Sequence, residues 1–267
     1  MISRKVATGI FFLLLSISLP AQIIGKKIKE IKAKHIKQVS VDRLGNFFLV
    51  FKNGVIKKYD ANGSVTTSTN GKITTLIEPW YHPSIFIYNQ TKQTFSVLGR
   101  NFENEKITSL ESAWAIEPIL VGPSNDNKLW IFDKADASLK KVNQFSTEVL
   151  TEFYLDTAQF KTPPLFTYLR EYQNMVFLLD RNSGIIILNN IGKQINKIEK
   201  AGIENFNFFG EELYYLNDSS IIFYDLYSEE THELKVSGEN KFALVTDERV
   251  ILVDKKNKVS LFDFKPN

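Results

Sequence analysis

Residues 39–60, VSVDRLGNFFLVFKNGVIKKYD, decide the fold of this chain. Their centre is the apolar run Phe47–Phe51, and the turn Lys52-Asn53-Gly54 separates it from a second β-rich run that ends at Asp60. An Asn-Gly pair between two β-rich runs is the strongest short-range signal for a β-hairpin. The stretch therefore predicts a strand, a turn, a second strand, a tight turn and a third strand.

The same hairpin recurs five more times along the chain. The residues that follow the six central runs are Lys52, Asn89, Asp133, Asp180, Asn217 and Asp254, in steps of 37, 44, 47, 37 and 37 residues. We expect an inner strand before each hairpin, at 36–42, 73–78, 115–121, 165–170, 203–209 and 242–246. We expect a third strand after each turn, at 55–60, 94–98, 139–143, 185–189, 221–225 and 259–263.

Outer strands are expected to follow the third strands, as at 107–110 and 195–198, where apolar and polar residues alternate. Four strands per repeat of about 40 residues, without helical periodicity, are typical of propeller blades. A β-sandwich would use only about seven or eight strands. The sequence therefore predicts an all-β fold, a six-bladed β-propeller of four-stranded antiparallel blades.

The last hairpin lacks a fourth strand of its own, because the chain ends soon after Asp263. At the other end, Lys27–Ala33 precedes the first inner strand and has the residue pattern of an outer strand. We expect this N-terminal strand to complete the last blade by pairing with 259–263, with Ile28 and Ile31 covering apolar surface. The alternative is a short amphipathic helix, since Ile24, Ile28 and Ile31 also have helical spacing.

Residues 1–21 have the pattern of a secretory signal peptide, and residues 22–267 would then form a single propeller domain. Arg4 and Lys5 precede the apolar segment 6–19, and Leu19-Pro20-Ala21 is a plausible cleavage site. The segment is shorter than the roughly 20 apolar residues that span a bilayer. We expect export to the periplasm, the outer membrane or the outside, with no integral span after cleavage; an uncleaved anchor is the alternative.

Charge argues against a nucleic-acid partner. The formal net charge of +3 falls to +1 when Arg4 and Lys5 are removed with the leader, which contains no acid. Phosphate binding needs a concentrated basic surface. The one dense group of lysines, in 26–37, is interpreted as the solvated face of an edge strand, where lysine discourages pairing with other chains.

The unit Val39–Val50, VSVDRLGNFFLV, resembles the blade opening of six-bladed propellers of the NHL and gluconolactonase-like group. The resemblance covers one blade well and the others loosely. It implies a binding platform or, as in some members, a lactonase or other hydrolase with a metal in the central channel. Fold alone does not decide between these functions.

The most unusual loop holds Trp80, Tyr81 and His82, between Pro79 and Pro83. Aromatic side chains in loops on a rigid platform suit the binding of peptides or sugars, so these three residues are the candidate ligand-binding residues. The alternative is that Trp80 packs between blades, as Trp114 and Trp130 are expected to do.

No catalytic or metal-binding residues are predicted. The histidines His35, His82 and His232 do not have metal-ligand spacing, and there is no cysteine. A ring of carboxylates after the second strands could ligate calcium, but capping of the local turns explains it better.

We therefore expect neither a metal nor another cofactor. The favoured function is that of a non-catalytic scaffold, secreted or periplasmic, which binds a protein, peptide or glycan. It would act alone or within an envelope assembly. A channel-metal hydrolase or lactonase is the alternative, and it would need inner-strand acids such as Asp42 and Glu78. A purely structural part of a larger complex is the third hypothesis.

Overall fold

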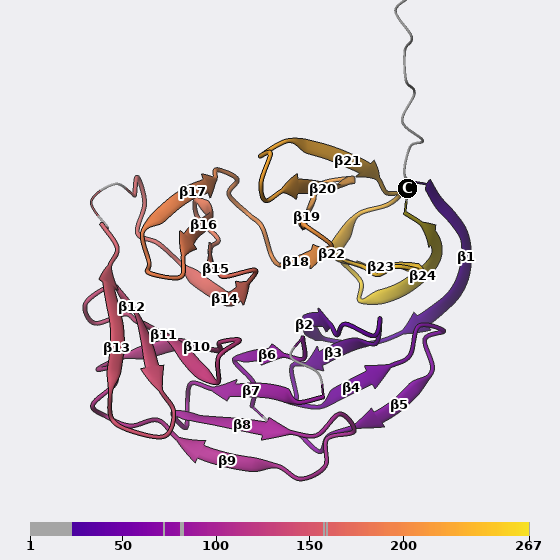
Figure 1. The fold of residues 1–267 in the computed structure, drawn as a ribbon. Coiled ribbons are helices and arrows are strands. Elements are labelled where there is room, and N and C mark those ends of the chain that lie inside the picture. The colour runs from indigo at the N-terminus through magenta and orange to yellow at the C-terminus, as the bar shows by residue number, and fades with distance from the viewer. Residues whose placement is uncertain (1–22, 72, 81–82, 157, 159, 267) are drawn as a thin grey trace, which may run out of the picture.

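A computed structural model describes residues 23–266 except 72, 81–82, 157 and 159. Twenty-four strands form six four-stranded antiparallel sheets, arranged in a ring around a central axis (Figure 1). The predicted all-β, six-bladed propeller is confirmed. The predicted signal peptide, residues 1–21, lies outside the described residues.

Each blade has one strand at the axis and three that follow outward. The innermost strands are β2 (Ile36–Val41), β6 (Leu76–Glu78), β10 (Pro118–Pro123), β14 (Phe166–Tyr172), β18 (Phe206–Phe209) and β22 (Asn240–Val245). The second strands are β3 (Phe47–Phe51), β7 (Ile85–Asn89), β11 (Lys128–Asp133), β15 (Met175–Asp180), β19 (Glu212–Asn217) and β23 (Arg249–Asp254). The third strands are β4 (Ile56–Tyr59), β8 (Thr94–Leu98), β12 (Ser138–Asn143), β16 (Gly184–Asn189), β20 (Ser220–Asp225) and β24 (Lys258–Lys265). The outermost strands are β5 (Val65–Ser68), β9 (Lys106–Ser109), β13 (Val149–Tyr154), β17 (Gln194–Ile198), β21 (Thr231–Lys235) and β1 (Ile23–Lys32).

The predicted third strands agree with the structure to within two residues at each end, whereas three inner strands begin later than predicted. Strands β6, β10 and β18 each start three residues after the expected position. In the third blade the Asp133 carboxylate accepts the backbone N–H groups of Ile116 and Glu117, at 2.8 Å each. These peptide groups are therefore satisfied outside the sheet ladder, which explains why the strand starts only at Pro118.

The ring closes through the N-terminal strand, as predicted. Strand β1 pairs antiparallel with β24, with Ile31 opposite Val259 and Lys32 opposite Lys258. The helical alternative for this segment is wrong. One detail also differs: the pairing register shifts between Lys27 and Lys29, and Ile28, which was expected to be covered, is 39% exposed.

The seam between the last blade and the first has an apolar core of its own. Ile36, Val39 and Leu49 of the first blade pack in one cluster with residues of the last blade, and Ile31 of β1 packs against it. Gly63, in the turn after β4, has a φ of +71°, and a Cβ there would lie only 2.9 Å from Leu261 and 3.2 Å from Ile31. The first blade therefore packs directly against the strand pair that closes the ring.

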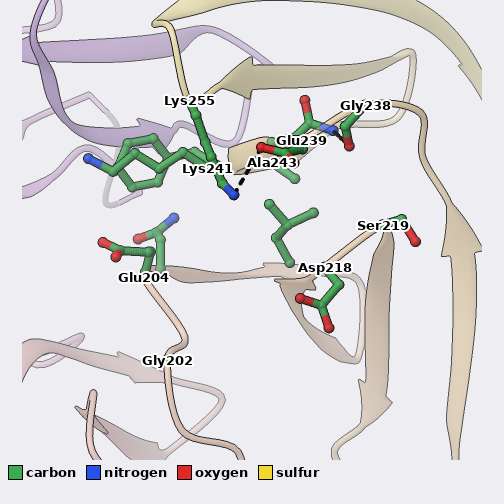
Figure 2. Close-up of a pocket in the computed structure, with 13 residues that line it drawn as sticks. Gly202, Glu204, Asp218, Ser219, Gly238, Glu239, Lys241, Ala243 and Lys255 are labelled. Carbon is green, nitrogen blue, oxygen red and sulfur yellow. Dashed lines mark hydrogen bonds and ion pairs between the residues drawn. The ribbon is translucent and has the colours of Figure 1, made fainter.

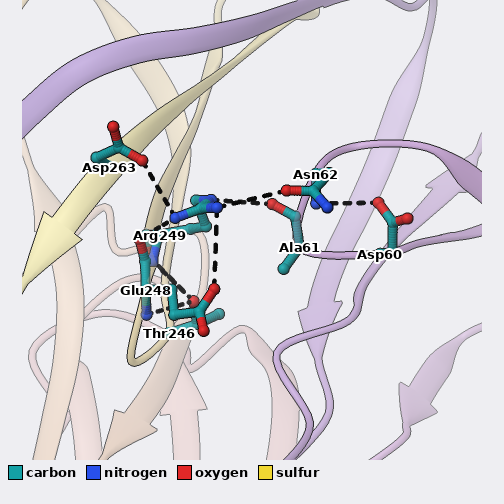
Figure 3. Close-up of polar contacts among 7 residues, drawn as sticks. All are labelled: Asp60, Ala61, Asn62, Thr246, Glu248, Arg249 and Asp263. Atoms are coloured by element: carbon teal, nitrogen blue, oxygen red, sulfur yellow. Dashed lines mark hydrogen bonds and ion pairs between the residues drawn. The ribbon is translucent and has the colours of Figure 1, made fainter.

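Polar contacts also join the first and last blades at the surface of the protein. The Arg249 guanidinium donates to the Ala61 carbonyl at 3.1 Å and lies 3.2 Å from Asp263 on β24 (Figure 3). Asn62, whose side-chain oxygen is 3.4 Å from Arg249, accepts from the same side chain. One arginine therefore links the β4–β5 turn of the first blade to two strands of the last.

Carboxylates after the second strands cap turns, as the sequence analysis favoured. Asp180 accepts the backbone N–H groups of Leu165 and Asn182, and Asp254 accepts those of Lys256 and Lys258. Asp133 is fully buried and also lies 2.8 Å from the Lys140 ammonium. Since each carboxylate binds its own blade, their regular recurrence reflects the repeat.

Asp133→Asn is expected to destabilise the fold by about 2 kcal/mol at neutral pH, because hydrogen bonds to a charged group are lost. Burial alone would raise the pKa of Asp133, but the Lys140 ammonium and the backbone N–H groups of Ile116 and Glu117 hold this pKa below its usual value. The stabilisation is therefore fully present above the unfolded pKa of about 3.9 and is lost as pH falls through the lower folded value.

Urea unfolding of both proteins, at neutral pH and at about pH 3, measures this difference. The exposed pair Lys255–Glu239 supplies the control, and Glu239→Gln should change stability little at either pH. A wild-type advantage that stays constant between the two pH values would contradict the assignment.

Candidate functional site

Alternate residues of the innermost strands face the propeller axis, since side chains along a strand alternate between its two sides. The axis-facing residues of one strand therefore lie at three successive levels along the axis. In the first blade the levels are marked by Gln38 and Ser40 of β2 and by Asp42 directly after it, and on β14 by Tyr168, Arg170 and Tyr172. The middle level is a polar plug, and a hollow lies at each end of the axis.

The plug is built around Arg170 and Glu78, which are both 1% exposed. The Arg170 guanidinium donates from both Nε and Nη2 to the Glu78 carboxylate, with Nη2 at 3.0 Å from Oε1. Its Nη1 donates to the Asn207 side-chain oxygen, and Nη2 also lies 3.5 Å from Ser40 Oγ. Four blades thus meet in one buried network at the middle of the axis.

The inner-strand acids required by the hydrolase alternative are both engaged by other groups. Glu78 is held by Arg170 and also accepts the backbone N–H of Trp80 at 2.8 Å. Asp42 accepts the backbone N–H groups of Leu44 and Asn46, at 2.9 Å each, and lies 3.6 Å from the buried Lys58 ammonium. Both carboxylates are therefore engaged by groups of the fold within the described residues.

Trp80 lies half-buried at one end of the axis, above the plug. We call this hollow the Trp80 mouth; the loops β2–β3, β6–β7, β18–β19 and β22–β23 line it, and its volume is about 320 Å³. The Trp80 ring meets Tyr172 edge to face with centroids 5.7 Å apart. The guanidinium carbons of Arg43 and Arg170 lie 5.4 and 5.8 Å from its centroid.

The support for Trp80 is rigid. Tyr172 stacks on Phe208 with centroids 4.0 Å apart and donates its hydroxyl proton to the Gly210 carbonyl at 2.6 Å. Burial raises the pKa of Tyr172, so this hydroxyl stays protonated at physiological pH. Trp80 therefore packs across the axis on another blade and remains partly accessible. Of the other predicted binding residues, Tyr81 and His82 lie outside the described residues.

The opposite hollow, which we call the lysine mouth, has a volume of about 540 Å³ and receives side chains from all six blades. Lys37, Lys52 and Lys241 belong to its lining. Figure 2 shows an adjoining hollow of about 460 Å³ between the last two blades, where Glu204 and Lys241 lie on facing segments. The two ends of the axis thus differ in charge, since Asp42, Asp247 and Glu248 line the Trp80 mouth.

Histidine and acidic side chains are dispersed in the described part of the chain. His35 lies between β1 and β2, whereas His232 lies on β21, 3.1 Å from Glu212. No group of three or more metal-ligating side chains comes together among the described residues. Within the same residues, no helix is long and apolar enough to cross a membrane.

Sequence reasoning missed Arg170 and the lysine mouth. A usable signal existed for Arg170, because a charged residue in an apolar inner strand, at the same alternation as Tyr168 and Tyr172, is expected to need a buried partner. The lysines gave no such signal, since each is an ordinary surface lysine in its own segment. Only the ring brings them together.

No protein-family model matches the chain, and no curated protein matches it. Among solved structures, the chain is similar to the WD40 domain of Pan2 from Neurospora crassa, with a TM-score of 0.61 and 8% identity over 91% of this chain and 96% of that domain. It is also similar to the extracellular domain of the hybrid two-component system BT4673 from B. thetaiotaomicron, with a TM-score of 0.54 and 14% identity over 85% of this chain and 33% of that one. The computationally designed protein Ika8 aligns with a TM-score of 0.50 and 14% identity, over 85% of this chain and 70% of that one.

At these identities the similarity concerns the fold alone, and it agrees with the propeller. The solved structures named above do not single out the NHL and gluconolactonase-like group, since one of them is a WD40 domain. The class of protein that fold and axis define is therefore a six-bladed β-propeller with a plugged central channel.

Proposed function

We propose that this chain is an exported, non-catalytic propeller that binds a peptide segment of a protein partner at the Trp80 mouth. The observation that carries the proposal is the placement of Trp80, half-buried on a fixed Tyr172 at an axial hollow of about 320 Å³. Tryptophan, tyrosine and arginine are the residues that most often dominate the binding energy of protein interfaces. Here Trp80 contacts both Tyr172 and Arg43 at one end of the axis.

The hollow has a further feature that suits a peptide. Leu44, 62% exposed, adds apolar surface at its rim.

Export rests on the leader pattern of residues 1–21, and the similarity to an extracellular domain is compatible with it. The resemblance of Val39–Val50 to NHL-type propellers also suits a binding platform. Our proposal places the partner in the cell envelope, where the propeller would act within an assembly.

Trp80→Ala is expected to weaken partner binding by about 2 kcal/mol or more, which is roughly 30-fold, because a central aromatic anchor is lost. Capture from the native envelope fraction identifies the partner, and calorimetry with the purified partner measures the affinity. N-terminal sequencing of this protein, purified from the native envelope fraction, should return a start near Gln22.

Leu44→Ala tests the same mouth at an exposed position and should weaken binding without changing stability. Tyr154→Ala is the matched control, since Tyr154 is 66% exposed on the outer strand of the third blade. Equal affinity of all three variants and the wild type would refute the proposed site. Binding of a protein-free glycan, lost in Trp80→Ala, would assign the mouth to sugars.

A further inference from the structure

The lysine mouth lies at the end of the axis opposite Trp80 and is larger than the Trp80 mouth, at about 540 against 320 Å³. Its size falls within the range of small-ligand sites. The wall is made by the first residues of the innermost strands and by the turns after the second strands. Tyr168, whose hydroxyl lies 3.4 Å from Glu78, separates it from the plug.

Positive charge exceeds negative charge in this mouth. Five cationic side chains and two carboxylates line it, and both carboxylates are already paired: Glu117 with Lys134 at 3.0 Å, and Glu204 with Arg181. Lys37, Lys52 and Lys241 take part in no ion pair among the described residues. Three ammonium groups therefore face one hollow with no carboxylate of their own.

Two of these lysines are held in place by neighbours. Lys37 donates to the Thr74 carbonyl at 2.6 Å, and desolvation by burial lowers the pKa of its ammonium. The Lys241 ammonium lies 4.7 Å from the centroid of the Phe242 ring (Figure 2 shows Lys241). A partly desolvated ammonium gains more from an added anion than one in bulk water does.

Polar and apolar groups complete the lining. Gln38 Oε1 and Thr167 Oγ1 are buried atoms that lack a hydrogen-bond partner among the described residues. On the same side of the propeller, Ile73, Ile116 and Leu165 precede the innermost strands of three successive blades. They are 57%, 81% and 50% exposed. The surface thus combines cations that have no carboxylate partner with an arc of exposed apolar side chains.

We propose that the lysine mouth is a second binding site, for a peptide segment of a partner protein that carries carboxylate side chains beside apolar ones. Charge complementarity selects the carboxylates, and three lysines from the first and last blades would receive them. The exposed isoleucine and leucine side chains would cover the apolar residues. This site is independent of the Trp80 mouth.

The probe is a short synthetic peptide of alternating glutamate and leucine, labelled for fluorescence anisotropy and titrated at about 150 mM salt, where long-range attraction is screened. The wild type should bind it, whereas an otherwise identical peptide with glutamine for glutamate should not bind. The triple variant Lys37→Gln, Lys52→Gln, Lys241→Gln should lose at least about tenfold in affinity.

A matched triple variant, Lys106→Gln, Lys193→Gln, Lys235→Gln, removes the same charge from exposed positions outside the lining and should bind within about twofold of the wild type. Equal losses in the two triples, or no binding by the wild type, would overturn the proposal. Pyrophosphate that displaces the peptide at equal concentration would also overturn it, in favour of a small-anion site. Trp80→Ala should bind the probe normally, so failure at one mouth is distinguishable from failure at the other.

Discussion

A chain that begins at Ile36 is expected to be insoluble or to melt far below one that begins at Gln22. Removing β1 breaks its ladder with β24, about half a dozen hydrogen bonds at roughly 1 kcal/mol each. It also uncovers the cluster against which Ile31 packs, worth about 1.5 to 3 kcal/mol for one such side chain. These losses would consume most of a typical stability of about 5 to 15 kcal/mol.

Thermal unfolding of the two chains measures this effect. If the short chain cannot be purified, point variants in β1 test the same contact. Ile31→Asp, at the seam, should cost about 2 kcal/mol or more, because a charge replaces an apolar group packed on the core. Ile28→Asp is the matched control, on the same strand but 39% exposed, and should be nearly neutral. Melting temperatures of the two chains within a few degrees of each other would show that β1 does not close the ring.

Arg170→Met is expected to destabilise the propeller by about 3 to 5 kcal/mol, because it leaves the Glu78 carboxylate buried without a counter-ion. At about 2 to 4 °C per kcal/mol for a chain of this size, the melting temperature should fall by roughly 10 °C. The Ser40 and Asn207 side chains lose a donor in the same step.

The double variant Arg170→Met, Glu78→Leu removes both charges and should recover much of the loss, since an apolar pair of similar volume can replace a buried ion pair. Arg181→Met supplies the surface control: it breaks the half-exposed pair with Glu204 and should cost less than about 1 kcal/mol. Urea unfolding of the four proteins gives the comparison. If the double variant is no more stable than Arg170→Met, then the unpaired Glu78 charge is not the cause of the destabilisation.

Local signals in the sequence determined the blades. Period-two alternation, the Asn53-Gly54 turn and the carboxylates after the second strands act within a few residues of each other, so they can be read without the ring. The same holds for the closing strand, because a blade with only three strands leaves an edge that must be covered. Boundaries such as the start of β10 were less predictable, since Asp133 reaches across its hairpin to take the N–H groups of Ile116 and Glu117.

The sequence also singled out Trp80 as a candidate but left open whether it would pack between blades or bind a ligand. Its half-buried position depends on Tyr172, 92 positions further along the chain, so no local pattern could decide the question. The structure describes neither Tyr81 nor His82, and their roles stay predictions.

Only the tertiary structure decided the plug and the lysine mouth. Arg170 and Ser40 are 130 positions apart and meet because six twisted sheets close into a ring. Lys37, Lys52 and Lys241 each have the pattern of an ordinary exposed lysine, and their shared hollow exists only once the first and last blades are neighbours. Turn chemistry and alternation fix the repeating unit, whereas the convergence of charges at the axis is a property of the closed ring.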